Sequence, residues 1–231
     1  MWNGKNKSVT FNFDDGISQD IRLVGIFNKY GLKCTFNLNS GIMNESGSFD
    51  IGSVKVRRMS ESGLAELYKG HEAAVHTLTH HDLLQLDDAS VRSEIIGDKE
   101  RLESIFGYEI CGMAYPYGTF DERIINIARA CGIKYSRTVC DTHSFDVPEE
   151  LMKLGASCHH GYDGVFSLID EFLEYSGEAP AVLNIWGHSY EFERDGSWER
   201  FEEICRRVSR RKDVFYGTNK EVYLSGTSNE A

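Results

Sequence analysis

Short apolar runs alternate with longer amphipathic runs along most of this 231-residue chain. The short runs, such as residues 9–13 and 181–186, are rich in β-branched and aromatic side chains, as strands are. The longer runs carry apolar residues at three- and four-residue spacing, which is typical of amphipathic helices. This alternation predicts βα units, and therefore an α/β fold with a parallel sheet covered by helices.

The individual elements follow from these two periods and from their flanking residues. Strands are predicted at residues 9–13, 34–38, 73–76, 110–115, 134–136, 181–186 and 214–216. Helices are predicted at residues 17–29, 60–69, 87–106, 121–130, 164–175, 197–210 and 218–224. Residues 40–59 and 139–161 have neither period and are expected to be irregular.

About seven parallel strands, most of them followed by a helix, favour one distorted (β/α) barrel. We expect residues 1–231 to form a single domain, because no linker rich in Pro, Ser or Gly divides the chain. A complete eightfold barrel usually needs ~250 residues, so this one is expected to lack a strand. Candidate reactive residues follow the carboxyl ends of several predicted strands, where parallel α/β folds build their sites.

Charge and composition narrow the classes of partner. The formal net charge is −11, which argues against nucleic acid and anionic membranes, because both require a basic surface. Six cysteines without a CxxC pair favour a reducing compartment. The first residues lack the apolar core of a signal peptide, and no run reaches the ~18 apolar residues of a membrane span. The chain is therefore predicted to be cytoplasmic, with its oligomeric state open.

Asp14 and Asp15 follow the first predicted strand, and Gly16 after them permits a sharp turn. Two adjacent carboxylates beside an apolar strand are costly when buried unpaired. A divalent cation would neutralise one of them and leave the other free to act as a base. The alternative is that an aspartate before Ile17 caps the next helix.

His76 and His80 follow the third predicted strand. If the segment makes one helical turn, residues four apart share a face and their rings can chelate one ion. An isolated HxxxH pair is common by chance. Together with an upstream aspartate, the pair favours a metal site, because two histidines and one carboxylate leave a coordination position open for water.

Two further strand ends carry candidate catalytic groups. Pro116 ends strand pairing and Gly118 permits a tight turn, which can aim the Tyr117 amide outward as an oxyanion donor. His188 lies beyond Gly187 after a buried strand, where a histidine is well placed as a general acid. The alternatives are an ordinary aromatic turn and a hydrogen-bonded histidine at the barrel rim.

Substrate contacts are assigned to aromatic and polar residues near these strand ends. Tyr115, Pro116 and Trp186 are candidates for an apolar floor on which a sugar ring stacks, with core packing as the alternative. His159 and His160 are neighbours whose side chains diverge, so both are not expected to bind one ion. We assign His160 to the pocket wall, with a plain surface position as the alternative.

These motifs together resemble the polysaccharide deacetylase family, the NodB-homology domain of carbohydrate esterase family 4. The family motif TFDDG is similar to residues 12–16, and H-[ST]-x-x-H matches residues 76–80 at every position. The motif R-x-P-Y-G matches residues 116–118 but has Ala114 where arginine is expected. A strand followed by histidine resembles residues 183–188, whereas the family's fourth motif is not clear, with Asp141 as the nearest candidate.

The resemblance implies a distorted, seven-stranded barrel and a set of roles. Asp15, His76 and His80 would bind one divalent metal, with zinc as the first choice and cobalt or nickel as alternatives, since these ligands accept all three. Asp14 would be the base, the Tyr117 amide the oxyanion donor and His188 the acid. What holds Asp14 in place of the missing arginine, and what partners His188, the resemblance leaves open.

The resulting hypothesis is a hydrolase that removes acetyl groups from N-acetylated or O-acetylated carbohydrate by metal-activated water. The expected substrate is an acetylated oligosaccharide or another small acetylated amide. Two alternatives stay open: an amidohydrolase acting on a small non-sugar amide, because fold alone does not fix chemistry, and a carbohydrate-binding module with a degenerate site. The missing arginine is the only support for the module.

Overall fold

The computed structural model describes residues 2–44 and 47–225. Its strands are β1 (Lys7–Asp14), β2 (Cys34–Leu38), β3 (Phe49–Ile51), β4 (Val54–Val56), β5 (Glu72–Val75), β6 (Gly112–Ala114), β7 (Tyr135–Asp141), β8 (Leu154–Ala156), β9 (Cys158–His159), β10 (Ala181–Gly187) and β11 (Val214–Tyr216). Its helices are α1 (Asp20–Tyr30), α2 (Leu64–Leu67), α3 (Asp88–Phe106), α4 (Glu122–Ala130), α5 (Val165–Glu174), α6 (Tyr190–Arg194), α7 (Trp198–Val208) and α8 (Asn219–Tyr223).

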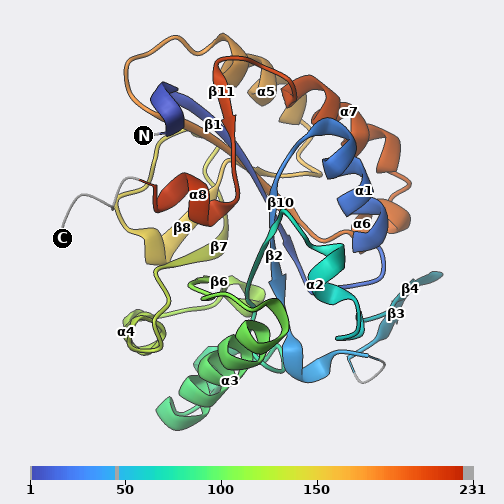
Figure 1. Ribbon diagram of the computed structural model, residues 1–231, viewed down its shortest axis with the longest axis vertical. Coiled ribbons are helices and arrows are strands. Elements are labelled where there is room, and N and C mark those ends of the chain that lie inside the picture. Colours follow the sequence, from blue (N-terminus) through green and yellow to red (C-terminus); the bar gives the residue numbers. More distant parts are fainter. Residues whose placement is uncertain (1, 45–46, 226–231) are drawn as a thin grey trace.

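Nine strands form one sheet in which every pair of neighbours is parallel, and the helices lie around its outside (Figure 1). The order is β8-β7-β6-β5-β2-β1-β10-β9, and β11 also pairs with β1. The predicted α/β class and parallel sheet are therefore confirmed. That residues 1–231 make up a single domain stays a prediction.

The nine strands occupy only seven positions around a distorted barrel. β11 pairs with the start of β1 and β2 with its end, so these two strands lie on the same edge of β1. β8 pairs with β7 and β9 pairs with β10, yet only Ser157 separates β8 from β9 in the chain. One short segment, residues 154–159, therefore joins the two ends of the sheet, which reconciles nine strands with the predicted seven.

The alternation along β1 explains how the layers form. All eight residues of β1 are buried, because helices cover one face of the sheet and the barrel interior lies on the other. Successive side chains in a strand point to opposite faces. Polar residues at alternate positions of β1 make contacts in the barrel interior, where Thr10 bonds to Asn219 and Asp14 to Asn37. The apolar ones pack against α1 and α7.

Two predicted irregular segments are more ordered than expected. Residues 40–59 contain the antiparallel hairpin β3–β4, and residues 139–161 contain β8, β9 and the end of β7. Their strands are too short to show a period in the sequence. The helix predicted at 60–69 is also shorter, covering only Leu64–Leu67. None of the helices within residues 2–44 and 47–225 is both long and apolar enough to cross a membrane.

Phe27 is the centre of the aromatic core between α1, α7 and the sheet. Its ring lies 4.8 Å from that of Phe11 and 5.7 Å from that of Phe201, measured between centroids, and its side chain is fully buried. Phe27→Ala is expected to lower the free energy of unfolding by ~3–5 kcal/mol, because it leaves a large cavity. Urea unfolding followed by circular dichroism measures this change.

Ile21 on the same helix provides the matched control, because its side chain is 56% exposed. Ile21→Ala is expected to change the free energy of unfolding by no more than ~0.5 kcal/mol, as surface substitutions usually do. Equal losses in the two variants would contradict the assignment of this core.

Candidate active site

A pocket of about 460 Å³ opens at the carboxyl ends of β1, β5, β6 and β10. Because the strands of the barrel are parallel, these ends meet on one side of it. The pocket is lined by eight of the predicted site residues, which are Asp14, Asp15, His76, His80, Tyr115, Tyr117, Trp186 and His188. The other two, Pro116 and His160, are buried and are not among its lining residues.

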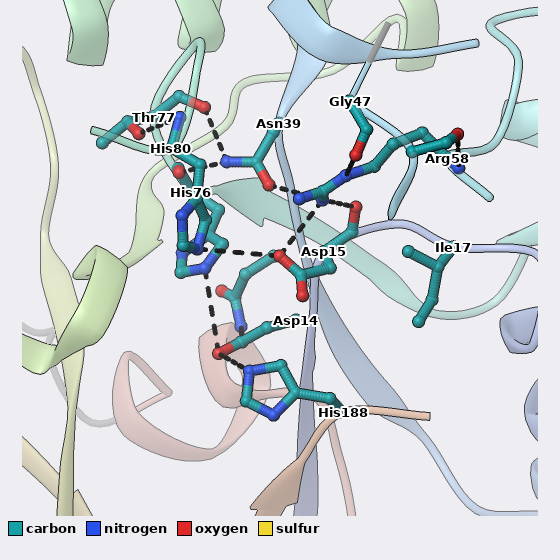
Figure 2. A network of polar contacts seen from close by, with 12 residues as sticks. Asp14, Asp15, Ile17, Asn39, Gly47, Arg58, His76, Thr77, His80 and His188 are labelled. Carbon is teal, nitrogen blue, oxygen red and sulfur yellow. Dashed lines mark hydrogen bonds and ion pairs between the residues drawn. The ribbon is translucent and has the colours of Figure 1, made fainter. Parts of the chain in front are cut away.

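Asp14 is the most tightly surrounded carboxylate of the site. One of its oxygens accepts a hydrogen bond from Asn37 Nδ2 at 2.8 Å, and the other is ion-paired with Arg137. The same oxygen lies 3.9 Å from His76 Nε2 and 3.8 Å from His188 Nε2, and Figure 2 shows both rings directed at it. Burial alone raises the pKa of Asp14, but the charges of Arg137 and of protonated His188 outweigh it, so the carboxyl stays ionised.

Arg137 supplies the guanidinium that Ala114 does not. Ala114 on β6 and Arg137 on β7 are register partners, so both side chains lie on the same face of the sheet. The Arg137 side chain is fully buried, and its guanidinium stacks 4.5 Å from the ring of Trp186. Trp186 Nε1 in turn donates to Asp141 at 2.7 Å. The guanidinium expected at position 114 is therefore supplied from the neighbouring strand, where it pairs with Asp14.

Asp15 also faces the pocket, but it is ion-paired with Arg58 and not with Arg137. Arg58 Nη1 lies 3.1 Å from Asp15 Oδ1 and donates to Asn39 Oδ1 at 2.8 Å. Burial raises the pKa of Asp15, and the Arg58 charge and nearby histidines lower it below its ordinary value. Asp15 does not cap a helix, because α1 begins at Asp20 and its N-cap residue is Gln19. The capping alternative is therefore wrong.

His76 and His80 come together without the helical turn that their spacing suggested. Thr77 and His80 both have positive φ, 64° and 61°, and Thr77 Oγ1 accepts a hydrogen bond from the His80 amide at 3.1 Å. This tight turn brings the ring centroids of the two histidines to 4.8 Å. The prediction that they share a face is thus realised through a turn and not through a helix.

The three residues Asp15, His76 and His80 form a donor set that fits a divalent cation. One potential ligand atom from each lies within 4.8 Å of the others. His76 Nδ1 is 2.9 Å from the Ala114 carbonyl, which fixes the proton on Nδ1 and leaves Nε2 as an acceptor facing the pocket. Burial lowers the pKa of His76 to about 4 and also lowers that of His80, so both rings are neutral at pH 7, as ligands must be.

Four of the nine non-glycine residues with positive φ in the described part of the chain lie around the pocket. Positive φ angles occur at Asp15 (89°), Thr77, His80 and Tyr117 (58°). Such conformations cost of order 1–3 kcal/mol each in a residue other than glycine, and they persist where the surroundings enforce them. Here the enforcing contacts include Asn37 O for the Asp15 amide and Leu38 O for the His76 amide.

Two more buried carboxylates accept hydrogen bonds from the segments around the pocket. Asp98 accepts hydrogen bonds from the amides of Ser40 and His76, at 2.7 and 3.0 Å. Asp20 accepts from Tyr68 at 2.7 Å and from Ser189 at 2.5 Å, and so ties the end of β1 to the end of β10. Burial raises the pKa of each of these two aspartates to about 7.

Glu191 is the partner of His188 that the sequence left open. The Glu191 carboxylate lies 3.5 Å from His188 Nδ1 and accepts a hydrogen bond from the His188 amide at 3.1 Å. The same oxygen lies 2.9 Å from Nε2 of both His159 and His160. His159 accepts from the Gly161 amide on Nδ1, so its own proton is on Nε2 and is donated to Glu191. Glu191 is therefore held ionised, with its pKa well below the usual range.

The Glu191 charge decides the protonation of His188. Burial by itself lowers the pKa of His188, but the Glu191 carboxylate beside Nδ1 and the charges of Asp14 and Asp15 raise it to about 9. The ring is thus an imidazolium at neutral pH and can donate a proton into the pocket. His160, assigned to the pocket wall from sequence, instead helps to hold Glu191.

The turn at Tyr117 leaves an amide free. The Ala114 carbonyl, three residues before, is occupied by His76, and within the described residues the Tyr117 N–H makes no hydrogen bond. The Tyr117 ring is 62% exposed and packs edge-on against His80 at 4.7 Å. An unpaired N–H beside the pocket is available to stabilise a developing oxyanion.

Three charged residues that organise this site were given no role from the sequence. Arg137 could have been suspected, since it lies in a run otherwise typical of a buried strand, just past the predicted limit at Ser136. Glu191 lies three residues after His188 and needed only the turn that follows β10. Arg58 comes from the hairpin that the sequence did not predict and gives no comparable signal.

Comparison with known proteins identifies the family of this chain. Residues 3–136 match the family model described as polysaccharide deacetylase, and the chain belongs to that family. It is 27% identical to a chitin deacetylase of Pestalotiopsis sp over 161 residues (69% of this chain, 50% of the relative). It is 26% identical to chitin deacetylase 2 of Cryptococcus neoformans var. neoformans serotype D over 195 residues (79% and 42%). The chain thus spans about half the length of these curated relatives.

Solved structures confirm the barrel at low sequence identity. The Xyl-CE4 domain of a multidomain xylanase from the hindgut metagenome of Trinervitermes trinervoides superposes with a TM-score of 0.63 at 16% identity, covering 98% of this chain and 93% of that one. A family 4 carbohydrate esterase from Streptomyces lividans, in complex with acetate, superposes with a TM-score of 0.56 at 16% identity, covering 93% of each. The expected deacetylase-like barrel is therefore the observed fold.

Arg137→Ala is expected to lower the free energy of unfolding at pH 7 by ~3–5 kcal/mol, because it leaves the Asp14 carboxylate buried without its cation. Adding Ala114→Arg should recover much of the loss, since residues 114 and 137 share a face of the barrel. Urea unfolding measures both variants. Arg129→Ala, which breaks an exposed pair with Glu150, is the control and should cost no more than ~1 kcal/mol. A stable Arg137→Ala variant would contradict the structural role of the pair.

Glu191→Gln is expected to lower the pKa of His188 from about 9 toward the ordinary value of ~6.5, because the variant loses the charge beside Nδ1. At pH 7.5 the ring would then change from mainly protonated to mainly neutral. Titration of the histidine ring signals by NMR, in protein treated with a chelator, measures this shift. Glu66→Gln on the exposed face of α2 removes a charge elsewhere and should leave the His188 titration unchanged.

Proposed function

We propose that this chain is a metal-dependent hydrolase that removes acetyl groups from N-acetylated or O-acetylated carbohydrate. One observation carries the proposal: the ionised Asp14 carboxylate lies within 4 Å of both a neutral ring, His76, and a protonated ring, His188. A base, a metal ligand and an acid therefore face one small space. The family membership supports the same reaction class.

Asp15, His76 and His80 would hold the metal, with zinc as the first choice and cobalt or nickel as alternatives. When bound, such a cation supplies a Lewis acid that polarises the acetyl carbonyl and acidifies water. The remaining residues perform the proton transfers. Asp14, kept ionised by Arg137, accepts a proton from the attacking water.

The developing oxyanion faces the Tyr117 amide, and His188 donates its proton to the leaving nitrogen or oxygen of the sugar. The products are acetate and a free amine or hydroxyl. Glu191 keeps His188 protonated before the step and balances its charge. Trp186 lines the same pocket and is the candidate apolar face for the sugar ring, whereas Tyr115 is 1% exposed and stacks on Phe120 in the core.

The two alternative functions differ in what supports them. The hypothesis of a degenerate carbohydrate-binding module was supported only by the missing arginine. Arg137 provides a guanidinium beside Asp14, so this hypothesis loses its support. An amidohydrolase for a small non-sugar amide would use the same residues. Acetate release from chitin oligomers, acetylated xylan and a panel of small amides separates it from a sugar deacetylase.

Asp14→Asn is expected to lower acetate release by at least ~100-fold, as loss of a general base does, while the protein still binds one metal ion. His76→Ala and His80→Ala are expected to lose the metal itself, because each removes one of three ligands. Elemental analysis of purified protein and an acetate assay measure the two effects separately.

The control is His143→Ala, because His143 is exposed and stacks on Tyr162 away from the pocket lining. It should keep both metal and activity. Full activity in Asp14→Asn would refute the base assignment, and a full metal content in His76→Ala would refute the ligand assignment.

A further inference from the structure

The β3–β4 hairpin forms one wall of the pocket, although it is outside the barrel. The hairpin follows β2 in the sequence and extends at the edge of the molecule beside α2 (Figure 1). Phe49 on β3 and Arg58 just after β4 both line the pocket. A segment inserted between two barrel strands therefore contributes to the same space as the strand ends.

Main-chain hydrogen bonds fix this hairpin to the turn that carries the two aspartates. Ser18 N donates to Arg57 O and Met59 N donates to Gly16 O, each at 2.8 Å. Ile17 and Arg58 form an antiparallel bridge between these two segments. The Arg58 side chain, seen in Figure 2, reaches from the hairpin to Asp15 and Asn39. The wall is thus part of the site and does not hang over it as a loose loop.

Apolar contacts join the same wall to the segment after His188. Val54, Val56 and Ile17 form a small buried cluster against which Tyr190 packs. The Phe49 and Tyr190 rings meet edge to face, with centroids 6.0 Å apart, and the Tyr190 ring lies 5.4 Å from that of His188. The hairpin and α6 therefore make one continuous side of the pocket, running from Asp15 to His188.

A second apolar side comes from the loops after β6 and from β7, away from β1 and β2 in the strand order. It consists of Tyr117 and Val139, which are 62% and 45% exposed, against 37% for Phe49. The turn at Gly118 lies so close to Val139 that an added Cβ would be 2.3 Å from Val139 Cγ2. Large exposed apolar side chains are thus placed on both sides of a pocket of about 460 Å³, toward the small end of the ~300–1,000 Å³ typical of small-molecule sites.

We propose that the wall made by the hairpin and α6 closes one end of the site, so that it accepts a chain end or a short acetylated saccharide and excludes internal residues of a polymer. The proposal rests on the proposed carbohydrate deacetylation. On this proposal a sugar ring would lie between Phe49 and Tyr117, in the pocket that Asp14 and His188 also line, and a chain continuing past it would meet the Phe49–Tyr190 pair. The hairpin, and not the barrel, then determines the length specificity.

The position of deacetylation tests this directly. Fully acetylated chitohexaose is incubated with the wild-type protein, and the products are sequenced by tandem mass spectrometry. Deacetylation at one terminal residue is expected. A variant in which residues 48–56 are replaced by two glycines, and the milder Phe49→Ala, should extend it to internal residues. Leu84→Ala, an exposed apolar side chain outside the pocket, is the control and should keep the terminal pattern.

A binding measurement gives the readout that does not depend on turnover. Calorimetry with zinc-loaded Asp14→Asn compares diacetylchitobiose with a soluble acetylated polymer of about 100 residues, with Kd expressed per chain. End recognition predicts equal values within about threefold, whereas recognition of internal residues predicts a polymer Kd lower by a factor of about 50 or more.

The outcomes separate the two proposals. Internal deacetylation by the wild-type protein, or a Kd per chain that falls with length, overturns the end-closing wall and leaves the deacetylase function intact. Acetate release only from non-sugar amides, with no binding of either saccharide, overturns the carbohydrate function and the wall with it. If the hairpin replacement does not fold, Phe49→Ala and the wild-type pattern still decide.

Discussion

The buried ion pair between Asp14 and Arg137 is the interaction on which the site depends. Removing two charges from water costs several kcal/mol each unless their geometry and additional hydrogen bonds compensate. Here Asn37 donates a hydrogen bond to Asp14, and Arg137 donates one to the Thr138 carbonyl. In return, the pair fixes an ionised carboxylate at the mouth of the barrel. His76, which follows β5, and His188, which follows β10, both lie beside this carboxylate.

The arrangement also explains how opposite protonation states coexist within a few ångströms. His76 is enclosed and bonded to a neutral carbonyl, so burial dominates and the ring stays neutral. His188 has Glu191 on one nitrogen and Asp14 near the other, so two negative charges outweigh burial and the ring stays protonated. Separating acid from base in this way requires no difference in residue type, only a difference in neighbours.

The order of strands and helices and several of the reactive residues could be predicted from the sequence. The period of the strands and helices gave the parallel barrel, and the strand ends gave Asp14, His76 and His188. What could not be predicted depends on register across strands. That Arg137 replaces an arginine at position 114 follows only once β6 and β7 are paired, and that Glu191 gathers His159 and His160 requires the barrel to close. Strands of two or three residues, such as β9 and β3, carry too little pattern to be recognised.

The way the barrel closes at Ser157 has a mechanical consequence. β7, which carries Arg137, and β10, which leads to His188, are not register partners of each other; each pairs with one half of residues 154–159. The bend at Ser157 therefore separates the strand that carries Arg137 from the strand that leads to His188. Movement at that seam would therefore shift Arg137 relative to Asp14, whereas the separation of Asp14 and His188 is set by the direct pairing of β1 with β10 from Lys7 to Phe13.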